Sequence, residues 1–198
     1  MHSRYITIRE AKDIDAGIEF LREFIPIHTA QPGFNGVTVT ADREGGLLGL
    51  ATHWATHHDL DASYCVLSEA RNEQLRVTGG VMTVETFEVT TDAIARSPAP
   101  GNPVIVTRVS MDPSGVDFQI TRFERELMPA IAARRGFSCS RLMANRTAGS
   151  LVLGVVWQDA SALKKHMEAV KSEREIAEAQ GVRIDEVSAR EILLINID

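Results

Sequence analysis

A short pattern that occurs twice constrains the fold of this 198-residue chain more than any other feature. Phe34 and Trp54 are 20 residues apart, and so are Phe137 and Trp157. One offset of 103 residues relates the two pairs, and a glycine precedes each phenylalanine. Two copies of one domain fit this length, because domains of about 100 residues are common. The repeat therefore predicts architecture, while it says little about chemistry.

Each copy carries the same predicted order of strands and helices. Period-two alternation predicts strands, and apolar residues at helical spacing predict helices. In the first copy we expect strands at 5–9, 34–41, 47–54 and 81–89, a helix ending near Pro26, and a helix at 56–76. In the second copy we expect strands at 104–109, 137–143, 151–157 and 191–197, and helices at 117–133 and 161–180. The order β-α-β-β-α-β is the ferredoxin-like arrangement.

The domain boundaries follow from the one proline-rich stretch, Ser97-Pro98-Ala99-Pro100-Gly101. We predict a first repeat at 1–92, a linker at 93–102 and a second repeat at 103–198. A four-stranded sheet with helices on one face leaves its other face bare, and about 100 residues bury little alone. We therefore predict an α+β fold in which the two repeats pack sheet to sheet as an intramolecular pseudo-dimer, with the helices outside.

Composition excludes several classes of protein. The net charge of −6 disfavours nonspecific binding to nucleic acid and to anionic membranes. Cys65 and Cys139 are too few for a disulfide framework, and no apolar run approaches the roughly 20 residues that span a bilayer. The N-terminus leads into a strand-like segment without the pattern of a signal peptide. We expect a cytoplasmic protein with no nucleic-acid or membrane partner.

The residues that form the repeat also resemble a known family. Gln31-Pro32-Gly33-Phe34-Asn35-Gly36 and Thr52-His53-Trp54 are similar to segments of the antibiotic biosynthesis monooxygenase domain, in the dimeric α/β-barrel superfamily. Gly136-Phe137 and Val155-Val156-Trp157 carry a fainter version. The resemblance implies a tandem that reproduces, in one chain, the homodimer common among members. The superfamily includes cofactor-free monooxygenases, haem-degrading enzymes, chlorite dismutase-like proteins and members without a known reaction.

The resemblance implies three possible functions. The first is a cofactor-independent monooxygenase that oxidises a small aromatic or quinol substrate, with no metal or flavin. Such an enzyme needs a dry pocket, a base and a cationic or hydrogen-bonding group, and the pocket would lie between sheet and helices. The second is a non-catalytic member that binds a small ligand or acts as a scaffold. The third is a haem protein, but the positions that carry the haem-branch residues fall on Thr107, His166 and Glu175, and none matches, although His166 could ligate iron from one turn away.

Four side chains are candidates for catalysis. His57 and His58 begin a predicted helix, where the positive end of the helix dipole keeps an imidazole neutral and suits a base. They are equally explained as two solvated residues. Tyr64 on the same helix could donate its phenol to a substrate, or pack in the core. Arg108 shares a strand face with two valines, and an inward guanidinium needs an anion or an ion-pair partner. We interpret Arg9 as its equivalent in the first copy.

Three further residues are candidates for the substrate pocket. Trp54 and Trp157 end a strand in both copies, where each would form a pocket wall or pack in the core. His28 follows the first helix and would line a pocket mouth or lie on the surface. No carboxylate or cysteine completes a metal site around His53 and the neighbouring histidines, so we expect no metal and no cofactor. Because the first copy holds most of the histidines, we expect the working pocket there.

Overall fold

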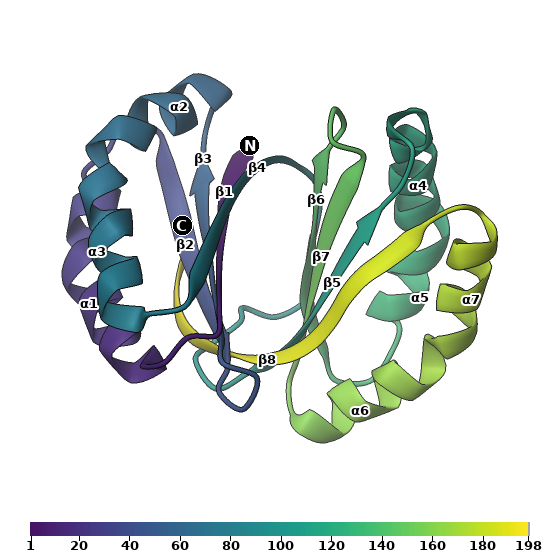
Figure 1. Cartoon of the computed structure of the whole chain (residues 1–198). Helices are drawn as coiled ribbons and strands as arrows, with labels where there is room; N and C mark the ends of the chain where they lie inside the picture. Colours follow the sequence, from purple (N-terminus) through teal and green to yellow (C-terminus); the bar gives the residue numbers. More distant parts are fainter. Residues whose placement is uncertain (198) are drawn as a thin grey trace. The chain divides into compact units, whose positions relative to one another are not determined.

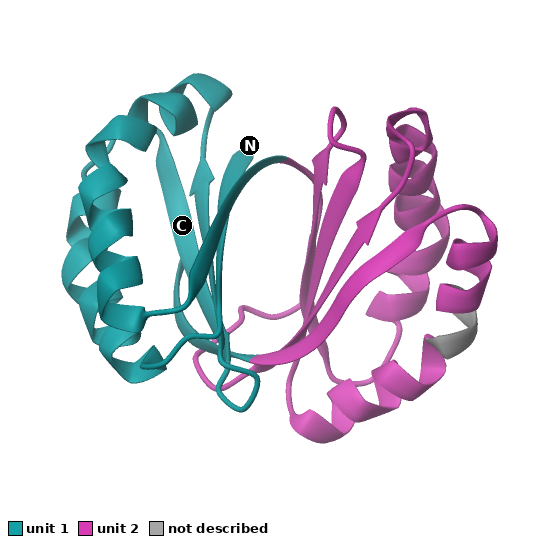
Figure 2. Ribbon diagram, in the orientation of Figure 1, with its two compact units in different colours: residues 1–87, 191–198 teal, residues 88–190 magenta. Residues whose placement is uncertain are grey.

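A computed structural model describes residues 1–197, with the side chains at 171–173 and 197 left out. The chain divides into two compact units, coloured teal and magenta in Figure 2. The first unit holds residues 1–87 and the C-terminal segment from Glu191, and the second holds Glu88–Arg190. The predicted fold class is confirmed: the chain is α+β, with two ferredoxin-like repeats whose strands close an eight-stranded barrel.

The first repeat has the predicted element order, labelled in Figure 1. Its elements are β1(His2–Arg9), α1(Ile14–Thr29), β2(Phe34–Asp42), β3(Leu47–Trp54), α2(His57–Val66), α3(Ser68–Thr78) and β4(Val81–Ile94). The second repeat has β5(Pro103–Ser110), the 3-10 turn η1(Pro113–Gly115), α4(Val116–Arg122), the π turn η2(Phe123–Leu127), α5(Met128–Ala132), β6(Phe137–Asn145), β7(Ser150–Trp157), α6(Ala160–Ala169), α7(Lys171–Ala179) and β8(Arg183–Ile197).

The strands are hydrogen-bonded in the closed order β1-β3-β2-β8-β5-β7-β6-β4. Each repeat therefore contributes its strands in the order fourth, first, third, second, as in a ferredoxin-like sheet. The fourth strands are the longest. The end of β8 pairs with β2 inside the first unit, and the end of β4 pairs with β6 inside the second. The boundaries 1–92 and 103–198 stay a prediction about the repeat, because each compact unit takes a strand segment from the other repeat.

Several helices differ from the prediction, among them the predicted helix 161–180, which is divided at Val170 into α6 and α7. Helix α1 does not stop at Pro26 but continues to Thr29. A proline removes one backbone hydrogen bond of a helix, and here the loss falls near the C-terminal end, where the last turn still closes with Ala30 N–H donating to Pro26 O. The predicted helix 56–76 is two helices, because the backbone of Leu67 leaves the helical region at φ −95°, ψ 8°.

Strand register corrects one equivalence. Thr7 pairs with Gly49 on β3, and Arg108 pairs with Val152 on β7. Since Gly49 and Val152 are related by the repeat offset, Arg108 corresponds to Thr7, and the assignment of Arg9 as its equivalent is wrong. The two repeats differ by two residues in the length of chain between their first and second strands, and this difference accounts for the error.

The core of each unit lies between its sheet and its helices. In the first unit the apolar side chains of β1, β2 and β3 pack against α1 and α3 on one face of the sheet (Figure 1). In the second unit, Ile105, Val155 and Trp157 of the sheet pack against Val116, Ile120 and the rest of the α4–α5 segment. None of the helices within residues 1–197 is long and apolar enough to cross a membrane.

Candidate functional site

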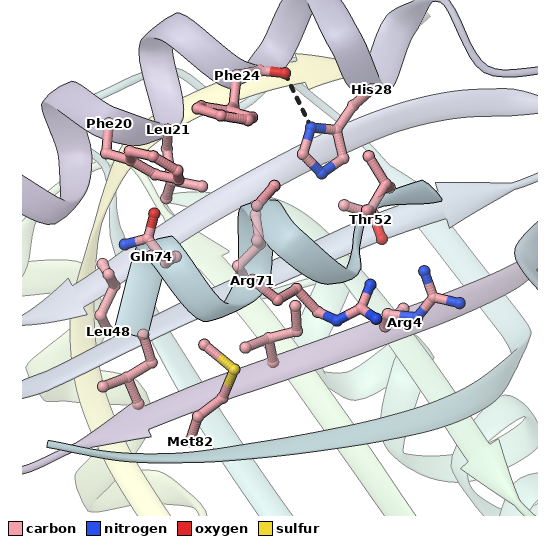
Figure 3. Close-up of a pocket in the computed structure, with 15 residues that line it drawn as sticks. Arg4, Phe20, Leu21, Phe24, His28, Leu48, Thr52, Arg71, Gln74 and Met82 are labelled. Carbon is pink, nitrogen blue, oxygen red and sulfur yellow. Dashed lines mark hydrogen bonds between the residues drawn. The ribbon is translucent and has the colours of Figure 1, made fainter. Parts of the chain in front are cut away.

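A pocket lies inside the first unit, between the helix-facing side of the sheet and helices α1 and α3. Its wall is mostly apolar, and Arg4, Arg71, His28 and Thr52 gather at one end of it (Figure 3). The fifth polar residue, Gln74, lies toward the other end, near Leu48. The cavity is about 20 Å³, which is room for one or two water molecules. An aromatic molecule would enter only after side chains of the wall move.

Arg4 comes to the pocket because strand alternation puts it on the same face of β1 as Ile6 and Ile8. Its residue is 2% exposed. Nη1 donates to Ser63 Oγ at 2.9 Å and Nη2 donates to Leu60 O at 2.6 Å, so both terminal nitrogens are held by helix α2. Nε is buried and has no hydrogen-bond partner. The guanidinium is therefore positioned firmly and keeps one donor unused.

Arg71 reaches the same end of the pocket from helix α3. It is 9% exposed, and its Nη2 donates to Tyr64 O at 2.6 Å, while Nη1 is buried without a partner. The Tyr64 ring covers both cations: its centroid lies 4.2 Å from Cζ of Arg71 and 5.1 Å from Cζ of Arg4. Figure 3 shows the two guanidinium groups beside each other. Two positive charges thus share one buried site.

This pair of cations has no carboxylate in direct contact within the described residues, and the charge of Asp61 acts on Arg4 only as the smallest of the causes that shift its pKa. Within residues 1–197, neither Arg4 nor Arg71 forms an ion pair with a carboxylate. Burial, followed by repulsion from Arg71, lowers the pKa of Arg4 to about 10, and burial also lowers the pKa of Arg71. Both remain protonated at neutral pH. A buried charge is costly unless it is paired, so the arrangement favours an anion in the pocket.

His28 is buried at 9% exposure, on the last turn of α1. Its Nδ1 lies 3.0 Å from Phe24 O, drawn as the dashed line in Figure 3. Because a carbonyl oxygen only accepts, Nδ1 carries the proton and Nε2 keeps its lone pair in the neutral ring. Burial, assisted by the charges of Arg4 and Arg71, lowers the pKa of His28 below its usual 6.5. The ring is therefore neutral at pH 7 and can accept a proton at Nε2.

The other histidines predicted for catalysis lie outside this pocket. His57 and His58 are exposed on the first turn of α2. Nδ1 of His57 lies 3.0 Å from Asp61 Oδ2, and its ring meets the ring of His2 edge-on at 5.3 Å. Tyr64 is 50% exposed, and it touches the site through its ring and its carbonyl.

Trp54, Trp157 and Arg108 do not line the pocket either. Both tryptophans are fully buried, and each meets the phenylalanine of its repeat edge-on. Trp54 also donates from Nε1 to Thr52 Oγ1 at 3.1 Å. Arg108 alternates with Ile105, which packs under the helices, so Arg108 lies on the opposite face of its sheet. The tryptophans are packed core in both units, and Arg108 stands apart from the pocket.

The second unit shows what the repeat contains when the cations are absent. By strand register and repeat offset, Ile105 takes the place of Arg4, His166 that of Ser63, and Met167 that of Tyr64. His166 is buried, lies 4.7 Å from the Trp157 ring and accepts at Nδ1 from Arg134 at 2.7 Å. These contacts occupy His166 and leave it unsuited to ligate haem iron. No cluster of three metal-ligating side chains occurs in the described part of the chain.

Comparisons with known proteins support the fold class. A scan of known protein families and a search of curated proteins find no match. Among solved structures, a candidate monooxygenase from Fusobacterium nucleatum subsp. nucleatum is similar over 100% of this chain and 94% of its own, with TM-score 0.73 and 12% identity. An anthrone oxidase-like protein has TM-score 0.73 and 14% identity over 99% of this chain and 93% of its own.

A third solved structure links the fold to the antibiotic biosynthesis monooxygenase-like proteins that the sequence resembles. A ferredoxin-fold protein related to antibiotic biosynthesis monooxygenases, from Listeria monocytogenes 4b F2365, matches 97% of this chain and 95% of its own at 8% identity, with TM-score 0.57. The chain therefore has the fold of the antibiotic biosynthesis monooxygenase-like proteins, as a tandem of two repeats. Identities this low establish the fold alone.

Proposed function

We propose that the chain is a cofactor-independent monooxygenase that oxidises a small aromatic or quinol substrate in the pocket of the first unit. The observation that carries this proposal is the meeting of a neutral buried imidazole, His28, with two buried guanidinium groups in one apolar pocket. A base, a stabiliser of negative charge and a dry wall are what oxygenation without a cofactor needs.

The chemistry divides between these groups. His28 Nε2 accepts the proton of a phenol or of an activated CH₂, and the guanidinium groups stabilise the anion that forms. The electron-rich anion then reduces molecular oxygen, the second substrate. Oxidation of a CH₂ group to a carbonyl consumes one O₂ and releases one water, so no further reductant is needed. The apolar walls exclude solvent while the anion exists, which strengthens its attraction to the cations.

The test is oxygen consumption by chelator-treated protein against a panel of quinols and anthrone-like phenols. We expect uptake that survives chelation and that falls at least ten-fold in His28→Gln. His57→Ala and His58→Ala are the matched controls, because both side chains are exposed on α2. If His57→Ala or His58→Ala lost oxygen uptake ten-fold while His28→Gln stayed active, the base would instead be a histidine at the start of α2.

The second candidate function is binding of a small ligand without turnover. The small size of the cavity, about 20 Å³, favours it. Tight binding of a panel compound without oxygen uptake by the wild-type protein would establish this function and exclude the first for that compound.

A further inference from the structure

The two unused guanidinium donors define the charge that this pocket is built to receive. Arg4 Nε and Arg71 Nη1 are both buried and both without a partner. Arg4 is fixed through Nη1 by Ser63 Oγ and through Nη2 by Leu60 O, and Arg71 is fixed through Nη2 by Tyr64 O. Protein groups thus hold both cations in place and leave a buried nitrogen on each, Arg4 Nε and Arg71 Nη1, without a hydrogen-bond partner. Two such donors suit the two oxygens of one carboxylate.

The second repeat shows what occupies the positions of these arginines in a unit without the cation pair. At the position of Arg4 the second unit has Ile105, which packs in an ordinary apolar core. The fold therefore does not need a guanidinium on this strand face. In place of Tyr64 and Arg71, the second unit has Met167 and Arg174, with Arg174 Nη2 at 3.6 Å from the Met167 sulfur. At these equivalent positions the first unit has two buried cations, Arg4 and Arg71, whereas the second has Ile105 and the half-buried Arg174.

The rest of the wall suits a ring next to that charge. Phe20 and Phe24 lie on the α1 side of the pocket, and their rings stack at 4.2 Å. Leu48, Leu50 and Met82 line the opposite side from the sheet. A ligand with a flat apolar body and an anionic end would place its body against these side chains and its charge against the arginines.

We propose that the ligand of this pocket is an aromatic carboxylic acid, bound as its anion by Arg4 and Arg71 together. This inference deepens the proposed function by naming the chemical class of the substrate. Binding of the acid does not require turnover, so the two can be tested apart. The carboxylate of the substrate binds the arginines, and a phenol or activated CH₂ group on its ring gives up a proton to His28. His28 lies at the same end of the pocket as the arginines.

The binding test compares benzoate with benzamide, which has the same shape without the charge. We expect calorimetric titration of the full chain to show benzoate at least ten-fold tighter than benzamide. Arg71→Met should weaken benzoate by ten-fold or more and leave benzamide unchanged. Arg174→Met is the matched control on the equivalent helix, and it should bind benzoate as the wild type does. Phenyl phosphate forms a further arm, which should bind more weakly than benzoate if the site is shaped for two oxygens.

A stability measurement separates ligand binding from a structural role. Because Arg71 is a buried cation without a counter-charge, Arg71→Met should keep or raise the melting temperature of the free protein. Arg4→Met provides a second variant, although it also removes the bonds to α2. Equal affinity of benzoate and benzamide, or benzoate binding that Arg71→Met leaves intact, would overturn the inference.

The outcomes for the two proposals differ. Benzoate binding that depends on Arg71, without oxidation of any compound in the panel, would retain the carboxylate site and remove the oxygenase. Oxidation of neutral quinols at the same kcat/KM as their carboxylated analogues would retain the oxygenase and remove the carboxylate site.

Discussion

His28 and His166 are both buried imidazoles, and each lies near two arginines, Arg4 and Arg71 for His28 and Arg134 and Arg174 for His166. His166 lies beside Arg134 and Arg174, and burial, followed by these two cations, lowers the pKa of His166 to about 4. In the unfolded chain an imidazole has its ordinary pKa near 6.5. Above that pH the ring is neutral in the folded and the unfolded chain, so its titration does not change the free energy of unfolding. As the pH falls from about 6.5 toward 4, the unfolded chain binds a proton that the folded chain refuses, so stability is lost.

The first prediction follows from the difference between the pKa of His166 in the folded chain and in the unfolded chain. Lowering the pH from 7.5 to 5 should reduce the free energy of unfolding of the wild type by about 2 kcal/mol more than that of His166→Gln. Urea unfolding at a series of pH values measures the difference, and His57→Gln is the exposed control. Parallel pH profiles for wild type and His166→Gln would contradict the assigned burial of a neutral ring.

At this scale, the sequence predicted residue types better than their roles. It indicated His28 for the pocket, and it marked Arg108 because an inward guanidinium needs a partner. The same rule applied to Arg4 and Arg71 finds the site, since Arg4 shares a strand face with Ile6 and Ile8, and Arg71 lies on the buried stripe of Leu67 and Gln74. Arg4 was missed because the predicted strand began at residue 5, one position too late to include it.

Helix α2 contributes the ring of Tyr64, which covers the arginine pair. The Tyr64 ring is half exposed and stacks on both guanidinium groups, while its carbonyl holds Arg71 whatever the side chain is. We expect Tyr64→Ala to widen the entrance and raise the association rate of benzoate several-fold. Tyr64→Phe keeps the ring and should behave as the wild type in stopped-flow binding and in oxygen uptake. A loss of uptake in Tyr64→Phe would show that the phenol itself acts, as the sequence allowed.

The start of α2 and the start of α6 are packed against equivalent glycines. Gly33 has φ +71° and Gly136 has φ +89°, so a side chain is strained at either position. A Cβ at Gly33 would meet Asp59 Oδ2 at 2.3 Å, and a Cβ at Gly136 would meet the Cβ of Ala162 at 2.5 Å. The aspartate can swing away, at the loss of its bond from Thr56 Oγ1, whereas Ala162 moves only with the helix.

These glycines give the third prediction. Gly33→Ala should cost about 1–3 kcal/mol of unfolding free energy from backbone strain, and Gly136→Ala should cost more because helix α6 must shift. Gly101→Ala is the control, with φ +88° but no atom within 4 Å of a Cβ, so it isolates the backbone term. Chemical denaturation of the three variants gives the order. Equal costs for Gly101→Ala and Gly136→Ala would show that packing against α6 contributes nothing.

Among the elements, the strands were predicted more reliably than the ends of helices. Alternation and the repeat located all eight strands, because a half-buried strand keeps its period of two. The predicted β8 began at 191, whereas it begins at Arg183, and β4 extends five residues beyond the predicted end to Ile94. Both extensions mix polar and apolar residues, and the extension of β4 pairs with β6, which is distant in sequence, so local pattern carries little sign of them. Breaks at Leu67 and Val170 likewise follow from packing.

At the scale of the whole chain, the long strands β4 and β8 make each compact unit depend on both repeats. The first unit uses Glu191–Ile197 of β8, which pairs with β2 from Gly36 to Ala41. The second unit uses Glu88–Ile94 of β4, which pairs with β6. The sequence repeat predicts two domains cut at the proline-rich stretch, but it carries no record of which strand ends are exchanged. That information resides in pairing between residues far apart in the sequence, such as Gly36 with Ile197 and Glu88 with Ala144.

The exchange predicts complementation between fragments. A chain divided within the exposed stretch 96–101 yields residues 1–98 and 99–198, and neither fragment alone contains a complete unit. We expect the two fragments to copurify when coexpressed and to remain unfolded or aggregate when expressed singly, because β2 and β6 would each be left as an unpaired edge. Size-exclusion chromatography and circular dichroism measure both outcomes. A C-terminal fragment ending at residue 190 should capture the first fragment more weakly, since it lacks the partner of β2. Two fragments that each purify as folded, separate monomers would show that the strand exchange is not needed, and that each repeat closes its own domain.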